Sequence, residues 1–515
     1  MKKFMQFVLL TLLTLTLFAC QDNDDIPEDD ALDYDAMFEM IADAIDEQLP
    51  IQFNRSIILP TFDEVNIEWT LNNEPITNIL VYSPPFMDKE ELVRAKITIA
   101  DMTRTYTYPI FTLAPDSPLN RNIMFINTDI PIEDVTKDTY RNASVSVRSF
   151  INETMTTVFD NNQVEIRGRG NSTWAMPKRP YRLKFAEDVS ILGMPEARNY
   201  VLLAEYADKS LLRNTVTFKF SSLLENIEHT PQTRVVEVYF NDAYHGVYTL
   251  TEHIEIHENK LSIDTIPNVE DAGFFLELDQ RFYQHGNTIG VDGISVAGIP
   301  YVIKMPKPRE DLTPQQVAYI EQYIRDMETA LTQKSGYEYY LDIDNFIDYF
   351  IVHELFKNVD VGWGSVFFYK RPSEVLKVGP IWDFDLAIGN ANYIDYGPPN
   401  WYGMRDHKNR WFKLMMDIPE VREKFKVRYM EIYEEKIPLL LEVVDELGNA
   451  MIPAANRNFR RWDILGQYDW PNPTEVVNAT TYSQQVRYIY NYIEARAEWM
   501  YYEVQSTNYQ NGIFD

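Results

Sequence analysis

A change in apolar periodicity along the chain constrains its fold more than any single motif does. Up to residue 278, apolar residues alternate in short runs of the kind that form strands, as in 65–69 and 235–240. After residue 313, they recur every three or four positions over longer segments, as helices require. The helices expected there span 314–332, 345–356, 419–433, 439–457 and 483–504. Strand-rich sequence followed by helix-rich sequence predicts an α+β fold.

The same pattern predicts where domains begin and end. Residues 34–49 carry apolar side chains on one helical face, and strand-like runs separated by turn residues follow at 57–111. We therefore expect residues 33–118 to form a helix and a small β-sandwich. This part resembles the immunoglobulin-like modules that precede many Bacteroidetes surface proteins. Residues 119–515 are expected to form a larger domain whose C-terminal part is helical.

The first 20 residues predict a lipid anchor. Met1-Lys2-Lys3 is positively charged, the run to Ala19 is apolar, and Leu17 to Cys20 matches the box that precedes an acylated cysteine in bacterial lipoproteins. Cys20 is also the chain's one cysteine, which rules out an intrachain disulfide. The alternative is an ordinary secretory signal with a chance cysteine. We expect residues 1–19 to be a signal peptide and Cys20 to anchor the protein to the outer membrane of a bacterial envelope.

Residues 20–32 are acidic and poor in apolar side chains, which predicts a flexible tether. An acidic tract directly after the acylated cysteine also resembles the surface-export signal of Bacteroidetes lipoproteins, so exposure at the cell surface is an open alternative. The whole chain has 78 Asp and Glu against 47 Lys and Arg, a net charge of −31. That balance argues against a nucleic-acid partner, because phosphates require a basic face.

Two neighbouring segments reverse this sign locally. Residues 167–174 follow a strand and contain two glycines between Arg167, Arg169 and a tryptophan, a composition that suits phosphate oxygens. The alternative is a tight structural loop whose arginines pair with acids. In the strand that follows, Arg182 and Lys184 point to the same side. They could hold a polyphosphate or form a solvated outer face.

Candidate acidic groups lie further along the chain. Asp383 and Asp385 follow an apolar run, and in a strand both carboxylates would share one face and could reach one divalent cation. Asp360 stands at the end of an apolar helical segment, where a helix-capping role is the alternative. Histidine and cysteine spacings typical of zinc sites are absent from the sequence, as is the Gly-x-Ser-x-Gly nucleophile elbow.

Taken together, these segments resemble the CotH kinase family, named for a bacterial spore-coat protein. The matching stretches appear in family order at 167–174, 178–185, 202–214, 236–252, 274–279 and 379–389. The resemblance covers roughly residues 120 to 400, with helical sequence continuing beyond. It implies an atypical protein-kinase-like fold that binds ATP and a divalent metal and can phosphorylate protein.

The resemblance also implies roles for individual residues. Lys184 would hold the α- and β-phosphates and count as catalytic, with Arg167 and Arg169 near the phosphates. Asp360 matches the aspartate that orients the acceptor hydroxyl, and Asp383 matches a metal aspartate. Asp385 is a further metal candidate close to it. The acidic partner of the lysine stays open between Glu225 and Glu252.

One departure from the kinase pattern bears on activity. Ser365 stands five residues after Asp360, where kinases have an asparagine that binds metal. A serine hydroxyl can bind Mg²⁺, but it is shorter and has no carbonyl oxygen.

Two functions follow from these expectations. The first is a lipid-anchored kinase that uses ATP with Mg²⁺ or Mn²⁺ to phosphorylate Ser or Thr of a surface or secreted protein. The alternative is a catalytically impaired kinase-like scaffold that acts as a binding or adhesion module at the cell surface.

Overall fold

The computed structural model describes residues 33–151, 154–264, 273–394, 396–405 and 409–514. The predicted signal peptide, Cys20 and the acidic tether therefore lie outside the described residues. The chain divides by its internal contacts into one unit of residues 1–51, 55–81 and 90–110 and a second unit of 52–54, 82–89 and 111–515. Among the helices described, none combines the length and apolarity that crossing a bilayer would require.

The described part of the first unit contains one helix and a small sheet. Helix α2 (Tyr34–Asp46) begins at Asp33, whose carboxylate accepts a hydrogen bond from the amide of Ala36 at 3.0 Å, and it buries Phe38, Ile41 and Ile45. The strands are β2 (Ile57–Ile58), β3 (Asn66–Leu71), β4 (Glu74–Ile76), β5 (Ile79–Leu80), β6 (Lys89–Ile99) and β7 (Met102–Thr112). Strand β6 alternates buried and exposed residues along most of its length. Within this unit the sheet order is β7-β6-β3-β4, and β2 pairs with β5. Strand β1 (Gln52–Phe53) belongs to the second unit, where it pairs with Phe111 and Thr112.

The second unit begins with a closed barrel in the order β10-β11-β12-β14-β13-β8-β9. Its strands are β8 (Asn122–Thr128), β9 (Arg141–Ile151), β10 (Thr154–Gly168), β11 (Tyr181–Val189), β12 (Ala197–Leu203), β13 (Thr233–Phe240) and β14 (Ala243–Glu252). The β13–β14 hairpin turns at Asn241 and Asp242, which both have positive φ, as a type I′ turn requires. Inside the barrel, apolar residues such as Val147, Leu183 and Tyr248 form one core.

A second sheet and a helical layer complete this unit. The sheet has the order β16-β17-β15-β18-β19, with β15 at Phe274–Leu278, β16 at Gly293–Val296, β17 at Ile299–Met305, β18 at Val366–Lys370 and β19 at Lys377–Val378. The helices are α3 (Arg213–Ser221), α4 (Pro314–Gln333), α5 (Ile343–Leu355), α6 (Arg410–Met416), α7 (Pro419–Glu435), α8 (Ile437–Arg461), α9 (Thr474–Asn478), α10 (Tyr482–Glu503) and α11 (Thr507–Gln510). Short 3₁₀ turns occur at Pro118–Asn120, Ile132–Asp134, Ser172–Ala175 and Tyr337–Tyr339.

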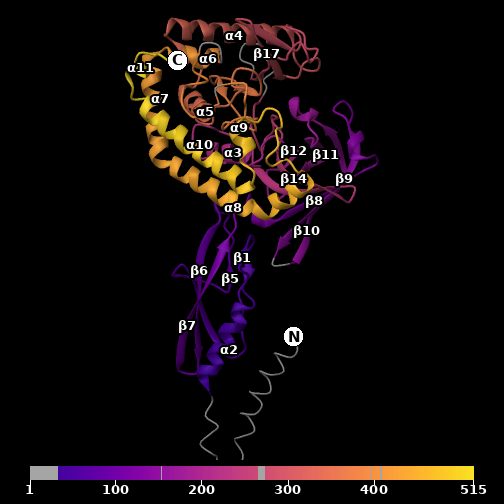
Figure 1. The fold of residues 1–515 in the computed structure, drawn as a ribbon, viewed down its shortest axis with the longest axis vertical. Coiled ribbons are helices and arrows are strands. Elements are labelled where there is room, and N and C mark those ends of the chain that lie inside the picture. The colour runs from indigo at the N-terminus through magenta and orange to yellow at the C-terminus, as the bar shows by residue number, and fades with distance from the viewer. Residues whose placement is uncertain (1–32, 152–153, 265–272, 395, 406–408, 515) are drawn as a thin grey trace, which may run out of the picture. The chain divides into compact units, whose positions relative to one another are not determined.

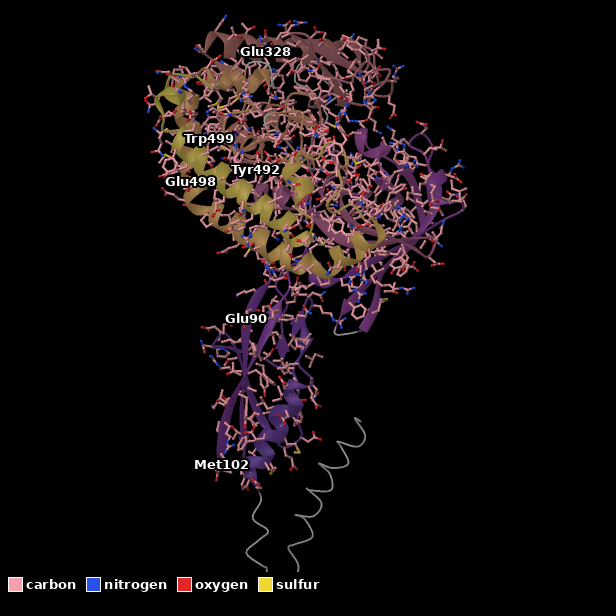
Figure 2. The ribbon with its side chains drawn as sticks, in the orientation of Figure 1. Glu90, Met102, Glu328, Tyr492, Glu498 and Trp499 are labelled. Atoms are coloured by element: carbon pink, nitrogen blue, oxygen red, sulfur yellow. The ribbon has the colours of Figure 1, made fainter. Side chains whose placement is uncertain are left out.

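The helices and the second sheet share one apolar core. Helix α5 is buried along nearly its whole length, and α8 packs along α10 (Figure 1). Helix α10 carries Trp499 (labelled in Figure 2). Arg496 lies over the ring of Trp499, which packs edge-on against the buried Trp401. This core supports the segments that follow α5, where the acidic candidates of the sequence lie.

The mixed α+β composition is confirmed, and so are the long helices predicted after residue 313. Helix α4 begins as expected at Thr313, which forms a capping box with Gln316. The expectation of a strand around Asp383 is wrong: residues 381–385 form no strand, and Asp383 has φ of 69°. A positive φ turns the backbone, so Asp383 and Asp385 do not share a face through strand alternation.

Candidate active site

A cavity of about 580 Å³ lies in the second unit, between the barrel, the second sheet and the loops that follow α5 and β19. Three arginines reach it from the barrel and its glycine loop, and four carboxylates reach it from loops. Glu277 and Lys304 of the second sheet also line it. We call Arg167, Arg169 and Arg182 the cationic wall, and Glu205, Asp360, Asp383 and Asp385 the acidic wall.

The cationic wall is built on paired strands. Arg167 of β10 stands opposite Arg182 of β11, and Arg169 follows the end of β10. Arg182 donates from Nε and a terminal nitrogen to the Asn199 side-chain oxygen, at 3.1 and 2.7 Å. Burial lowers the pKa of Arg182, and the neighbouring charges of Arg167 and Arg169 lower it further. Three mutually repelling guanidinium groups are an arrangement that an anion with several charges stabilises.

The structure does not bring Lys184 into this cavity. Its side chain is 46% exposed, and its Nζ pairs with Glu165 at 3.0 Å across the β10–β11 ladder. Arg182 is the cation of strand β11 that lines the cavity instead. The two candidate acidic partners also lie elsewhere: Glu225 pairs with Arg428 at 2.9 Å, and Glu252 accepts the amide of Gln232 at 2.7 Å.

The glycine loop is packed by its own side chains. A Cβ placed on Gly168 would lie 2.2 Å from the ring of Trp174, and Gly170 has φ of +87°. The packing of the loop therefore requires glycine at both positions, as expected for a tight structural loop. Arg167 of this loop does not pair with an acid, as the alternative of a tight structural loop would require. It donates to the carbonyl of Lys137 at 3.3 Å, and its buried Nε has no hydrogen-bond partner in the described part of the chain.

The acidic wall lies in loops, and two of the predicted metal residues are in contact there. The hydroxyl of Ser365 donates to the Asp383 carboxylate at 3.0 Å. Both residues have positive φ, 58° and 69°, which places their side chains on sharp turns. Asp360 and Asp385 line the same cavity. The structure therefore brings together all the predicted site residues of the described part except Lys184.

Burial and nearby negative charge raise the pKa of three carboxyl groups in this wall. Burial, with the charge of Asp383 as the next cause, raises the pKa of Asp360 to about 7. Burial and then Asp383 also hold the pKa of Asp385 well above its ordinary value. The pKa of Glu205 is raised to about 7 by burial and by Asp208. Carboxylates in this condition favour either protons or a nearby cation.

Two buried asparagines fix the backbone of the acidic wall. The Asn358 side chain accepts the amide of Asp360 at 2.9 Å and donates to the carbonyl of Asp383 at 3.3 Å. Asn214 of α3 accepts the amide of Phe384 at 2.8 Å and donates to the Glu205 carboxylate at 3.2 Å. Each asparagine therefore joins two separate parts of the wall.

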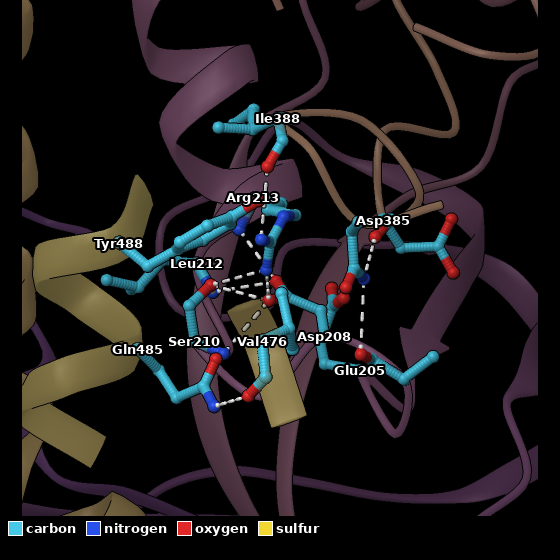
Figure 3. A network of polar contacts seen from close by, with 12 residues as sticks. Glu205, Asp208, Ser210, Leu212, Arg213, Asp385, Ile388, Val476, Gln485 and Tyr488 are labelled. Atoms are coloured by element: carbon cyan, nitrogen blue, oxygen red, sulfur yellow. Dashed lines mark hydrogen bonds and ion pairs between the residues drawn. The ribbon is translucent and has the colours of Figure 1, made fainter. Parts of the chain in front are cut away.

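The buried ion pair of Asp208 and Arg213 supports the acidic wall (Figure 3). Asp208 accepts the amides of Leu212 and Arg213, and it pairs with the Arg213 guanidinium; both side chains of the pair are fully buried. Arg213 also donates to the carbonyls of Ala387 at 3.0 Å and Ile388 at 3.1 Å. The start of α3 is thereby tied to the loop that carries Asp383 and Asp385.

The carboxylates of this cavity could supply only part of the ligands that Mg²⁺ or Mn²⁺ requires. In the described residues, no three His, Cys, Asp or Glu side chains are arranged to hold a metal ion. Mg²⁺ in kinase sites usually takes one or two carboxylates and completes its shell with phosphate oxygens and water. Asp383 and Asp385, with Ser365 beside them, could supply such a partial set. The raised pKa of Asp385 reflects burial first and then the negative charge of Asp383, which a cation would offset.

Several cavity residues were not singled out from the sequence, among them Glu205, Asn214, Glu277, Asp279 and Arg281. The first four lie inside segments that carry the family resemblance, 202–214 and 274–279, so the available signal was their position in those segments. Their types alone gave no reason to prefer them among 78 acidic residues.

Comparison with protein-family models matches residues 166–500, well over half of the chain, to the family described as CotH kinase protein. The match begins at the end of β10 and continues through most of α10, so it includes every residue of the two walls. A search of curated proteins found no match.

Proposed function

The chain belongs to the CotH kinase family, and from this premise we propose that it is a lipid-anchored kinase. It transfers the γ-phosphate of ATP to a Ser or Thr hydroxyl of a surface or secreted protein, with Mg²⁺ or Mn²⁺. The observation that carries the proposal is that the three arginines of the cationic wall and the four carboxylates of the acidic wall line one cavity of about 580 Å³. A nucleoside triphosphate with its metal carries both charges that such a cavity requires.

The cationic wall would bind and orient the triphosphate. Guanidinium groups donate two parallel hydrogen bonds to phosphate oxygens, and the free Nε of Arg167 offers one more donor. Burial lowers the pKa of Arg169, and the charges of Asp383 and Asp385 act against that effect, so this arginine lies near the acidic wall. Its guanidinium also lies 5.5 Å from the ring of Trp382. It would meet the phosphates nearest the transfer step.

The acidic wall would bind the acceptor and hold the metal. Asp360 has a pKa of about 7, so close to neutral pH its carboxylate can accept the proton of the acceptor hydroxyl. Asp383 and Asp385 would hold the metal, with Ser365 fixing the orientation of the Asp383 carboxylate. The metal, when bound, neutralises charge on the β- and γ-phosphates.

Location and partners form part of the same proposal. Acylation of Cys20 would hold the protein at the outer membrane, with residues 20–32 as a tether and the helix with its immunoglobulin-like module next along the chain. ATP is the proposed small-molecule partner, and nucleic acid is not expected at a net charge of −31.

A second function rests on one specific observation. Ser365 replaces the metal-binding asparagine of kinases, and its hydroxyl is already engaged with Asp383. Loss of that ligand would favour a kinase-derived scaffold that binds partners at the cell surface without transferring phosphate.

Calorimetric titration of ATP, with Mg²⁺ and without it, separates the two functions when it is combined with an autophosphorylation assay. The kinase predicts Mg²⁺-dependent binding, binding without transfer in Asp360→Asn, and weakened metal-dependent binding in Asp383→Asn. Binding without transfer in the wild type, with transfer gained in Ser365→Asn, supports the scaffold. No binding at millimolar ATP in any variant contradicts the kinase proposal.

A further inference from the structure

The loop that carries Asp360 has no basic side chain of its own. Residues 361–364, between Asp360 and Ser365, are Val, Gly, Trp and Gly. The three arginines of the cationic wall belong to the barrel and its glycine loop, so the acceptor side of the cavity needs a cation from another part of the chain. Charge that develops on a transferring phosphoryl group is stabilised by fixed cations placed beside it.

Arg281 supplies a cation at this place. It lines the cavity just after the end of β15, and its side chain is only 21% exposed. Its guanidinium lies over Gly364: a Cβ at that glycine would come within 2.7 Å of a terminal nitrogen of Arg281. The glycine therefore makes room for the arginine directly beside Ser365.

Asp279 holds Arg281 in this position. The Asp279 carboxylate accepts the Arg281 amide at 2.9 Å and its Nε at 3.1 Å, and His285 approaches the other carboxylate oxygen at 3.4 Å. The amide of Gln280 also donates to the carbonyl of Trp363 at 2.8 Å, which joins this turn to the Asp360 loop. The hydrogen bonds that Arg281 donates to described residues come from its amide and Nε, and none comes from a terminal nitrogen.

Electrostatics place the same guanidinium near Asp360. The charge of Arg281 lowers the pKa of Asp360 against the upward effects of burial and Asp383. The side chain thus faces the group that would orient the acceptor, and its two terminal nitrogens remain available to a ligand.

We propose that Arg281 is a catalytic residue that binds the transferring phosphoryl group from the acceptor side. Hydrogen bonds to Asp279 hold its side chain in place, and Gly364 leaves the space that its guanidinium occupies. This inference rests on the proposed kinase function. In the step, the bond between the γ-phosphorus and the oxygen that bridges to the β-phosphate breaks, and its electrons stay on ADP. The acceptor oxygen bonds to phosphorus, and its proton passes to Asp360. Arg281 donates to the equatorial oxygens throughout.

The test compares transfer with binding in the full-length protein solubilised in detergent. Arg281→Gln is expected to lower the maximal autophosphorylation rate about 100-fold or more, as loss of one such donor does, while ATP affinity stays within about threefold. Arg281→Lys keeps the charge but loses the two-pronged geometry and should fall between. Arg325→Gln, at a half-exposed arginine of α4, is the matched control and should change neither quantity.

Three outcomes overturn the inference. The first is an unchanged rate of phosphate transfer in Arg281→Gln. The second is an equal loss of ATP affinity and transfer rate, which would make Arg281 a nucleotide-binding residue. If the Arg281→Gln variant does not fold, the Asp279→Asn variant is measured in its place. An unchanged transfer rate in Asp279→Asn is the third outcome that overturns the inference. A wild type that binds ATP but transfers no phosphate contradicts the kinase proposal instead, so the two failures remain distinct.

Discussion

The cationic wall and the acidic wall of the cavity differ in the backbone that carries them. Arg167 and Arg182 sit on paired strands of a closed barrel, and the ladder alone determines their spacing. Asp360 and Asp383 sit in loops, one of them at a positive φ, and side chains from distant segments hold these loops in place. The arginines repel one another and remain partly accessible, whereas the acidic residues depend on buried partners.

This difference separates what each wall contributes to stability from what it contributes to binding. Removing an arginine should relieve repulsion and leave the barrel intact, so its cost should be found in ligand affinity. Removing a support of the acidic wall leaves buried polar groups without partners, so its cost should be found in stability first.

The largest expected effect is on the buried support of the acidic wall. Asp208→Asn leaves the fully buried Arg213 charge uncompensated and should lower the free energy of unfolding by about 3–5 kcal/mol. Urea denaturation followed by circular dichroism measures it. Glu165→Gln, at a half-exposed pair of the barrel, is the control and should cost less than about 1 kcal/mol. Equal losses in both variants would remove the contrast between the walls.

The next effect concerns the cationic wall. Arg182→Gln should weaken Mg²⁺-ATP binding by about 10- to 100-fold, the value of one hydrogen bond to a charged group, with the unfolding free energy unchanged or slightly raised. Lys184→Gln, two residues along the same strand face, should leave affinity within about twofold. Calorimetric titration of Mg²⁺-ATP measures the affinity of both variants. A larger loss for Lys184 would restore it as the phosphate-binding residue.

The third effect depends on pH. Burial and then Asp383 raise the pKa of Asp360 to about 7 and hold that of Asp385 well above its ordinary value, so a metal ion bound beside them displaces protons that they carry. Mn²⁺ affinity without nucleotide should therefore rise between pH 6 and pH 8, by up to about tenfold for each proton released per pH unit. Titration in buffers of different ionisation enthalpy should detect that proton release. Affinity that is independent of pH would mean that metal binding releases no proton from Asp360 or Asp385.

The smallest effect concerns the hydroxyl beside Asp383. Ser365→Ala removes one hydrogen bond to a half-buried carboxylate and should cost about 0.5–1.5 kcal/mol of stability. Thermal unfolding at pH 8 measures this loss. The loss should shrink when saturating Mn²⁺ is present, because the metal would then orient the Asp383 carboxylate. An unchanged loss with metal would show that the serine orients Asp383 by itself.

Much of the fold followed from periodicity, because helices and strands of the barrel leave regular apolar patterns. Helices α4, α7 and α10 agree with their predicted spans to within two residues at either end. The alternation that places Arg182 and Lys184 on one side of β11 is also as expected. Strands β12 and β16–β19 were not predicted, since they are short or buried on both faces and lack a period-two signal. Residues 381–385 form a loop because tertiary hydrogen bonds replace those of a strand there.

The sequence by itself determined which kinds of residue meet at the site. Arg167, Arg169, Asp360, Ser365, Asp383 and Asp385 were all expected there, and all of them line one cavity.

The tertiary structure decided which cation of β11 faces that cavity. Arg182 and Lys184 share one side of the strand, so alternation cannot separate them. The β10–β11 register places Glu165 opposite Lys184 and Arg167 opposite Arg182. The first cross-strand pair neutralises itself, whereas the second cannot, and only the second lines the cavity. Register arises from the closure of the barrel, which no local pattern encodes.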